Sequence, residues 1–228
     1  IEWLEFDILQ EFPEVKHAGF LKGYNFDAKE EKNQKKILEI LHVKQGVKLW
    51  QCHKSDIIEA KNEGEEWVLK NDFDGVVTKE RGLGLLVRHA DCQAALLYDP
   101  IQKVIGNIHC GWRGSVLNIY REALLFMGSH YGSLSKNIRV CISPSLGPEA
   151  AEFIHFQQEF PESFWKYQVK PSYFDFWEIS KNQLMEEGVL ERNIEIAKIC
   201  TYSNQKDCFS YRRDKLTGHH GTCIALSN

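Results

Sequence analysis

Residues 82–114 have the sequence GLGLLVRHADCQAALLYDPIQKVIGNIHCGWRG, and this stretch decides the fold. It contains three apolar runs rich in β-forming residues, at 82–90, 92–99 and 103–111. Asp99-Pro100 supplies a turn between the last two runs. We therefore expect three neighbouring buried strands.

A helix is expected directly after the third run. Its buried face is predicted by apolar residues that recur every three or four positions within 112–128, namely Val116, Ile119, Ala123, Leu124 and Met127. Similar patterns predict helices over 30–42, 157–165 and 176–188 and strands over 48–53, 138–145 and 194–202. Because the strands are short and their intervals irregular, a regular βαβ winding is not expected. We expect an α+β fold, a single-domain layered α/β sandwich with mixed sheets over residues 1–228.

The composition is that of a globular protein with little affinity for nucleic acid. Hydrophobic residues make up 43% of the 228, enough for a sizeable core, and the formal net charge of -4 offers no positive excess to neutralise a phosphate backbone. No apolar run approaches the roughly 20 residues that cross a bilayer, and the acidic segment 1–15 is unlike a secretory signal. Seven cysteines, an odd count without a CxxC pair, favour a reducing compartment. We expect a cytoplasmic protein that binds neither membranes nor nucleic acid; its oligomeric state stays open.

Three residues at predicted strand ends have the side chains of a metal site: His53, Cys92 and His109. Two imidazoles and a thiolate bind Zn²⁺ well, and three protein ligands leave a fourth position for water or substrate. The alternative is that each residue only packs in the core, as free cysteines and single histidines at strand ends usually do. The three positions are far apart in the sequence, so a metal site forms only if the fold brings them together. Asp91 interrupts the apolar stretch beside Cys92, and a buried carboxylate needs a cation or a hydrogen-bond donor close to it.

Two further segments are candidates for binding an anionic or polar substrate. Arg113 lies between Gly111 and Gly114, which permit close backbone approach at a helix start, and its guanidinium offers two parallel charge-assisted hydrogen bonds. The alternative for this arginine is a surface salt bridge. The run Phe-Ser-Tyr-Arg-Arg-Asp at 209–214 is either a solvated charged face or the wall of a pocket, and its aromatic residues favour the pocket.

Together these motifs resemble the laccase-domain purine nucleoside phosphorylase family, whose members were once called multicopper polyphenol oxidases. The resemblance spans about residues 20–226 and rests on elements in the family's order: Gln51-x-His53, His89-Ala90-Asp91-Cys92, His109-Cys110-Gly111-Trp112-Arg113-Gly114, Cys200-Thr201, Phe209-Ser210-Tyr211-Arg212-Arg213-Asp214 and Thr217-Gly218.

The resemblance implies a layered fold similar to that of cytotoxic necrotizing factors, and a site that holds Zn²⁺, with copper as the alternative metal. It implies phosphorolysis of adenosine, inosine, guanosine and methylthioadenosine by inorganic phosphate, with deamination of adenosine as a second activity. His53, Cys92 and His109 are then the metal ligands and catalytic residues. The implied substrate-binding residues are Arg113, Ser210, Arg212 and Arg213, with Arg113 or Arg212 holding the phosphate.

Three features depart from the family's pattern. The loop 19–26 has Lys22 and a shortened connection where the family has an arginine and paired glycines. His219 follows Thr217-Gly218 where arginine is common, and Cys110 replaces alanine beside His109. Substrate contacts from the loop are therefore in question, and Cys110 is a candidate for oxidation or adventitious metal binding.

Other functions remain open at the level of sequence. Cys92 activated by His109 would suit a metal-free amidohydrolase that acts on a peptide or a cell-wall precursor. Copper-dependent oxidation of polyphenols is the weakest reading, since coupling four one-electron oxidations to O₂ needs several coppers and more histidines. A binding module that keeps the fold without turnover is the non-enzymatic alternative.

Overall fold

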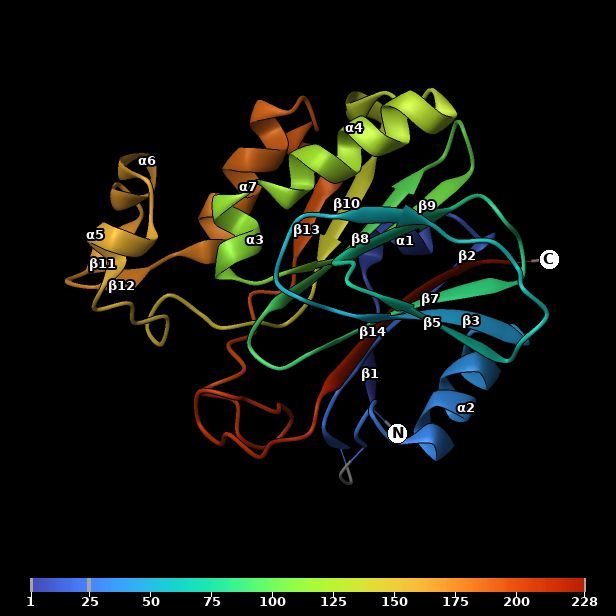
Figure 1. The fold of residues 1–228 in the computed structure, drawn as a ribbon, viewed down its shortest axis with the longest axis horizontal. Coiled ribbons are helices and arrows are strands. Elements are labelled where there is room, and N and C mark those ends of the chain that lie inside the picture. The colour runs from blue at the N-terminus through green and yellow to red at the C-terminus, as the bar shows by residue number, and fades with distance from the viewer. Residues whose placement is uncertain (1, 24–25, 228) are drawn as a thin grey trace.

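Two six-stranded mixed sheets, stacked face to face, form the centre of the molecule (Figure 1). The computed structural model describes residues 2–23 and 26–227. Sheet A has the strand order β1 (Trp3–Leu4), β2 (Val15–Phe20), β14 (His220–Leu226), β7 (Leu83–His89), β3 (Gln45–Trp50) and β5 (Trp67–Asn71). Sheet B has the order β13 (Ile194–Ile196), β10 (Arg139–Ile142), β8 (Gln93–Asp99), β9 (Val104–Cys110), β6 (Gly75–Thr78) and β4 (Ile57–Glu59).

Strands β8 and β9 form the hairpin at the centre of sheet B. Their pairing runs from Gln93 opposite Cys110 to Asp99 opposite Val104. The Asp99 carboxylate closes the turn by accepting hydrogen bonds from the backbone N–H groups of Ile101 and Gln102. Because both faces of this sheet are covered, the two strands are buried along their whole length.

Helices cover the outer faces of the two sheets, which gives four layers. The core between the sheets contains Leu85 and Val87 of sheet A against Leu96 and Ile105 of sheet B, all fully buried. Burial of each such side chain contributes roughly 1.5–3 kcal/mol. Helices α4 (Ile119–Tyr131) and α7 (Phe176–Glu186) lie on sheet B, and α2 (Glu31–Ile40) lies on sheet A (Figure 1).

An aromatic extension projects from the side of the sandwich (Figure 1). It contains α5 (Phe156–Glu159), α6 (Glu162–Trp165) and the ribbon of β11 (Gln168–Lys170) and β12 (Tyr173–Phe174). Its apolar cluster includes Phe153, Phe160 and Phe174 and reaches Trp112 on α3 (Trp112–Val116). The remaining short elements are α1 (Asp7–Gln10) and two 3₁₀ turns at Ser135–Asn137 and Glu191–Asn193.

The layered α+β architecture with mixed sheets is confirmed, and one strand assignment is wrong. The run 82–90 forms β7, which pairs with β14 and β3 in sheet A and does not pair with β8, a strand of sheet B. The chain changes sheets at Ala90-Asp91-Cys92, where Asp91 adopts a positive φ of 82°. A turn of this kind redirects the chain within three residues, and the apolar pattern on either side carries no sign of it.

Two predicted helices are broken, and some strands end early. The helix over 112–128 divides into α3 and α4 at Asn118, which has φ 53° and caps α4 with its side chain. The helix over 157–165 divides at Pro161. The strand over 48–53 ends at Trp50 and that over 194–202 ends at Ile196. Within the described ranges, no helix is both long and apolar enough to cross a membrane.

Candidate metal centre and active site

Three side chains from different parts of the sandwich converge at one end of the sheets. His53 follows β3, Cys92 precedes β8, and His109 is the penultimate residue of β9. Their donor atoms all lie within 4.8 Å of one another. Cys92 Sγ is 3.9 Å from His53 Nε2, and the two imidazole rings are 4.9 Å apart at 88°.

This donor set fits a single metal ion. A tetrahedral zinc ion with bonds of about 2.0–2.3 Å holds its nitrogen and sulfur donors roughly 3.3–3.6 Å apart, so small side-chain movements would close the site. His109 is buried while His53 is exposed, which leaves one side open to a substrate. Among residues 2–23 and 26–227, no other group of His, Cys, Asp or Glu side chains gathers in this way.

Asp74, at the start of β6, supports two of the three residues. Its carboxylate is fully buried, and Oδ1 accepts hydrogen bonds from His109 Nδ1 at 2.8 Å and from the His53 backbone N–H at 2.9 Å. Oδ2 accepts from the backbone N–H groups of Cys52 and Lys54. The contact with Nδ1 leaves Nε2 of His109 free to bind a metal, as carboxylate partners of metal-binding histidines do.

Sequence reasoning missed Asp74, although a signal for it exists. Asp74 stands directly before the apolar run Gly-Val-Val-Thr at 75–78, so burial of its carboxylate was foreseeable. For Asp91, the sequence predicts that its carboxylate needs a cation or a hydrogen-bond donor close to it, and the structure provides two donors. Asp91 accepts hydrogen bonds from Thr201 Oγ1 at 2.6 Å and from the Arg212 backbone N–H at 2.7 Å.

The turn that carries His53 is fixed by neighbours on both sides. Gln51 Nε2 donates to the Arg88 carbonyl at 2.6 Å, which prolongs the β3–β7 pairing after β3 has ended. His53 then adopts a positive φ of 60°, a strained conformation that clusters at functional sites. Gly111 completes the enclosure, because a Cβ there would lie 2.9 Å from His53 Cδ2 and 3.1 Å from Cys92 Sγ.

The ionisation of these groups is coupled. Burial opposes ionisation of the Cys92 thiol, but the positive charge and hydrogen bonds of His109 and His53 outweigh it and lower its pKa to about 6. Burial likewise disfavours the charged form of His109, yet the Cys92 thiolate and Asp74 raise its pKa to about 9. For Asp74, burial raises the pKa, but its bonds to His109 and to the backbone lower it to about 2. The site therefore favours an anionic thiolate, the form that binds metals.

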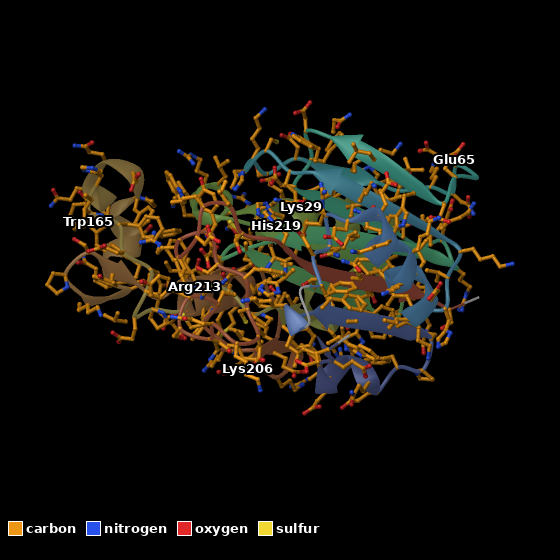
Figure 2. All side chains as sticks on the ribbon, turned by 90° about the horizontal axis from the view of Figure 1, so that it is seen from below. Lys29, Glu65, Trp165, Lys206, Arg213 and His219 are labelled. Carbon is orange, nitrogen blue, oxygen red and sulfur yellow. The ribbon has the colours of Figure 1, made fainter. Side chains whose placement is uncertain are left out.

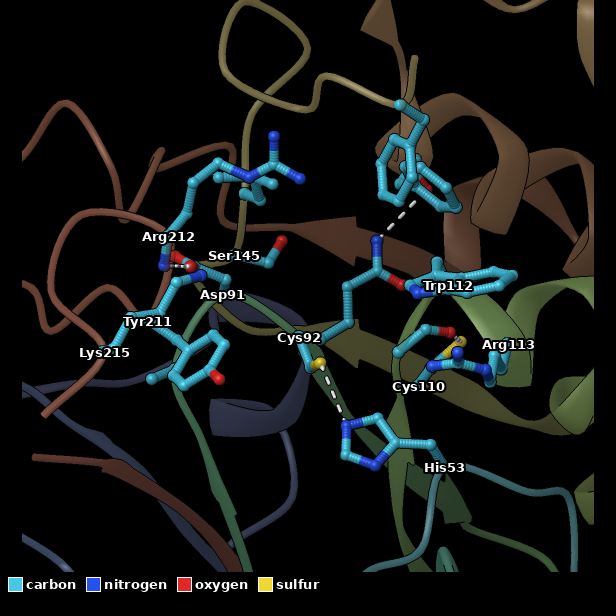
Figure 3. Close-up of a pocket in the computed structure, with 16 residues that line it drawn as sticks. His53, Asp91, Cys92, Cys110, Trp112, Arg113, Ser145, Tyr211, Arg212 and Lys215 are labelled. Carbon is cyan, nitrogen blue, oxygen red and sulfur yellow. Dashed lines mark hydrogen bonds between the residues drawn. The ribbon is translucent and has the colours of Figure 1, made fainter. Parts of the chain in front are cut away.

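A cavity of about 450 Å³ opens beside the three residues (Figure 3). His53 and Cys92 lie at its centre, with Trp112 and Arg113 on one side and Tyr211, Arg212 and Lys215 on the other (Figure 3). Its apolar wall comes from the aromatic extension and α7, through Leu146, Phe153 and Phe176. The cavity thus combines flat apolar surfaces with several cationic groups.

The structure places two of the four predicted substrate-binding residues in this cavity. The Arg113 guanidinium lies over the Trp112 ring at 4.2 Å, and it forms no ion pair with a carboxylate of the described chain. Arg212 donates from Nη1 to the Glu152 carbonyl and lies over the Phe153 ring at 5.4 Å. Both guanidinium groups therefore keep donors available to a ligand.

Ser210 and Arg213 lie outside the cavity lining. Arg213 donates to the carbonyls of Thr201, Tyr202 and Cys208. Ser210 is fully buried and accepts a hydrogen bond from the Arg213 backbone N–H. In this geometry the pair holds the loop that presents Tyr211 and Arg212.

The departures from the family pattern fall in different places. Cys110 is buried with its Sγ 3.3 Å from Ser115 Oγ, and burial raises the pKa of its thiol to about 12. His219 lies near Asp27, whose Oδ1 accepts a hydrogen bond from its backbone N–H. In the loop 19–26, residues 24 and 25 lie outside the described residues, so only its flanks are placed.

The family pattern and the similar proteins that match this chain agree on one family. The family described as multi-copper polyphenol oxidoreductase laccase matches residues 24–227. A purine nucleoside phosphorylase of Bacteroides thetaiotaomicron is 35% identical over 149 residues, which cover 61% of this chain and 55% of that protein. A purine nucleoside phosphorylase of Campylobacter jejuni is 30% identical over 162 residues, which cover 70% of each chain.

Solved structures share the architecture. The crystal structure of YlmD from Geobacillus stearothermophilus has a TM-score of 0.86, at 21% identity, over 100% of this chain and 97% of that chain. The chain spans about half the length of several curated relatives that it matches, between 42% and 55%. Because the family pattern covers nearly all of the sequence, the chain belongs to the multi-copper polyphenol oxidoreductase laccase family.

Proposed function

We propose that this protein is a zinc-dependent purine nucleoside phosphorylase with adenosine deaminase as a second activity. Adenosine, inosine, guanosine and methylthioadenosine are the proposed nucleosides, and inorganic phosphate is the second substrate. The observation that carries the proposal is the convergence of His53, Cys92 and His109 beside a cavity that has aromatic walls and cationic groups. The names of the relatives support the same reaction class.

The cavity suits a nucleoside in size and in chemistry. Its volume of about 450 Å³ falls within the range of roughly 300–1,000 Å³ of small-molecule pockets. Trp112, Phe153 and Phe176 offer apolar aromatic surface to a flat purine. Arg113 and Arg212 line the cavity, and their proposed role is to donate hydrogen bonds to the polar atoms of the substrate.

Phosphorolysis requires the chain to position two substrates and to stabilise charge. A phosphate oxygen forms a bond to ribose C1′ while the bond from C1′ to N9 breaks, and the electron pair of that bond leaves with the base, which takes up a proton. The ribose becomes positively charged in the transition state, so an anion held in line with the breaking bond lowers the barrier.

The metal is proposed to be zinc, held by His53, Cys92 and His109. Bound there, it would act as a Lewis acid and activate water, which is the chemistry that replacement of the purine C6 amino group by oxygen requires. Copper-dependent oxidation of polyphenols is less well supported. The described part of the chain offers one three-ligand group, whereas reduction of O₂ by four electrons draws on several coppers.

The direct test is incubation of the metal-loaded protein with adenosine, with and without phosphate, followed by chromatography. We expect adenine and ribose 1-phosphate to appear together only when phosphate is present, and inosine to appear in both conditions. Adenine release that does not depend on phosphate would exclude phosphorolysis.

A metal-free amidohydrolase is the second candidate, and one observation favours it. Cys92, His109 and Asp74 form a chain of thiol, imidazole and carboxylate in which the Cys92 pKa is lowered to about 6. This order is typical of cysteine nucleophiles. Metal content separates the two readings, because an amidohydrolase of this kind would hydrolyse peptides after complete removal of metal.

The cytoplasm is the proposed compartment. An odd number of cysteines without a CxxC pair is typical of a chain that is kept reduced. The proposed partners are small molecules, purine nucleosides and phosphate.

A further inference from the structure

A second cavity, of about 590 Å³, lies against the same three metal-site residues. It sits where β3 and β7 end, and it shares His53, Cys92 and Tyr211 with the first cavity. A ligand in the second cavity would therefore meet a ligand in the first at the metal centre. The two cavities differ in their linings, since the second lacks the phenylalanine wall of the first.

Arg88 provides the main positive charge of this second cavity. It lies on β7, and its half-buried guanidinium donates from Nη2 to the Leu49 carbonyl at 3.2 Å. Its Nε is buried, and no described residue accepts that hydrogen or forms an ion pair with Arg88. Desolvation lowers the pKa of Arg88, and the Asp27 carboxylate opposes that shift without forming an ion pair with the guanidinium. The arrangement is that of an arginine whose anionic partner is a ligand.

Lys29 adds a second cation to the lining that contains Arg88. His219, which is drawn close to Lys29 in Figure 2, adds a neutral ring, because burial lowers its pKa to about 4. Asp27 orders both of them through the backbone, because its Oδ1 accepts from the N–H groups of Lys29 and of His219. The Lys29 side chain is exposed and forms no ion pair with the described carboxylates, and His219 Nδ1 is buried without a partner. Asp27 is the acidic group that faces this cluster, so two permanent cations and an unpaired ring nitrogen stand against one carboxylate.

We propose that Arg88, together with Lys29 and His219, binds the inorganic phosphate that serves as second substrate. The inference rests on the proposed phosphorylase function and assigns the phosphate to the second cavity, away from Arg113 and Arg212. A planar guanidinium with free N–H groups matches a tetrahedral oxyanion through parallel charge-assisted bonds. The nucleoside then occupies the aromatic cavity, and the two substrates meet beside the metal centre.

Binding of phosphate is tested first, by isothermal titration of inorganic phosphate into the metal-loaded protein. Arg88→Met keeps the apolar stem and removes the charge, and Arg81→Met is the matched control. Arg81 precedes β7 at its opposite end and donates to the Ser227 carbonyl, far from the cavity. We expect Arg88→Met to weaken phosphate binding by roughly 10- to 100-fold, as expected for loss of a charged hydrogen-bonding group, and Arg81→Met to leave it unchanged. Equal affinity in the wild type and Arg88→Met would overturn the proposal.

Steady-state kinetics then separate the two cavities. Arg88→Met should raise the KM for phosphate with little change in the KM for adenosine, whereas Arg113→Met should do the reverse. If Arg113→Met alone raised the KM for phosphate, the phosphate would belong in the first cavity. A wild-type protein without phosphorolysis would contradict the proposed function, while the titration would still report on the anion site.

Two further experiments test whether the loss of phosphate binding reflects misfolding and whether the site binds a phosphate ester instead of inorganic phosphate. Lys29→Met changes an exposed side chain, so we expect little change in stability, and it should weaken phosphate binding several-fold. Adenosine 5′-monophosphate is titrated in parallel. Tighter binding of this ester than of phosphate, lost in Arg88→Met, would identify a nucleotide site and refute the assignment to inorganic phosphate.

Discussion

Asp74 joins the metal site to the backbone that carries it. One oxygen of its carboxylate holds the ring of His109 and the backbone of His53, and the other holds the turn on either side. Loss of the negative charge of Asp74 would therefore disturb the positions of two metal ligands, His53 and His109. Partners of this kind typically change metal affinity by about 10- to 100-fold when they are replaced.

We predict that Asp74→Asn weakens zinc affinity by about 10- to 100-fold, measured by competition with a chelator. Asn keeps the size of the side chain, but its amide nitrogen cannot accept a hydrogen bond. Asp99→Asn is the matched control, since Asp99 is equally buried and accepts two backbone N–H bonds at the distant hairpin turn. Similar losses of zinc affinity in both variants would point to general destabilisation.

Glycine is required at position 111 for steric reasons, and its backbone conformation is not the cause. Its φ of -81° is ordinary for any residue, yet an added Cβ would meet His53 and Cys92 at 2.9 and 3.1 Å. We predict that Gly111→Ala folds and loses at least ~10-fold in zinc affinity, because one of the two side chains must move. Gly106→Ala, in the preceding strand β9, would make only ordinary contacts of 3.5 Å, and its zinc affinity should match the wild type. Unchanged zinc binding in Gly111→Ala would refute this reading of the site.

At the scale of elements, the break between α3 and α4 depends on one residue. Asn118 adopts the left-handed conformation and its side chain accepts a hydrogen bond from the Arg121 backbone N–H at 3.3 Å. The helical periodicity continues through the break, so the sequence pattern predicted one helix where there are two. Asn is among the residues that tolerate both roles, capping and positive φ.

We predict that Asn118→Ala lowers the free energy of unfolding by about 1–2 kcal/mol, because it loses the cap and forces a Cβ into a left-handed conformation. Asn118→Gly should cost less, since glycine adopts positive φ freely. Urea unfolding of the two variants measures the difference. A glycine variant as unstable as the alanine variant would show that conformational strain has no part in the effect.

Periodicity located the long helices and half of the twelve strands in the two described six-stranded sheets, but not the strand partners. The ends of helices α2 and α7 and of strands β8, β9 and β10 lie within three residues of the predicted ends, because each element has one clear apolar face or a buried run. Strand β14, fully buried at the centre of sheet A, was not predicted. The assignment of β7 failed because a single turn at Asp91 moves the chain from one sheet to the other.

At the scale of the whole molecule, the stacked sheets bring the site together. In sheet A, β3 ends shortly before His53 and β7 ends shortly before Cys92. In sheet B, β9 carries His109. Residue type pointed to these three side chains, but their convergence follows from pairings that are distant in sequence. No sequence motif marks Arg88, and the one sequence signal for Asp74 is its place directly before the apolar run 75–78.

One metal ion held by His53, Cys92 and His109 is proposed to support phosphorolysis. The most direct measurement removes metal with a chelator, titrates zinc back and follows the phosphate-dependent release of adenine from adenosine. We predict no release from the metal-free protein and a rate that rises until one zinc ion is bound per chain, with Cys92→Ala inactive throughout. Full-rate release by the metal-free protein would contradict it.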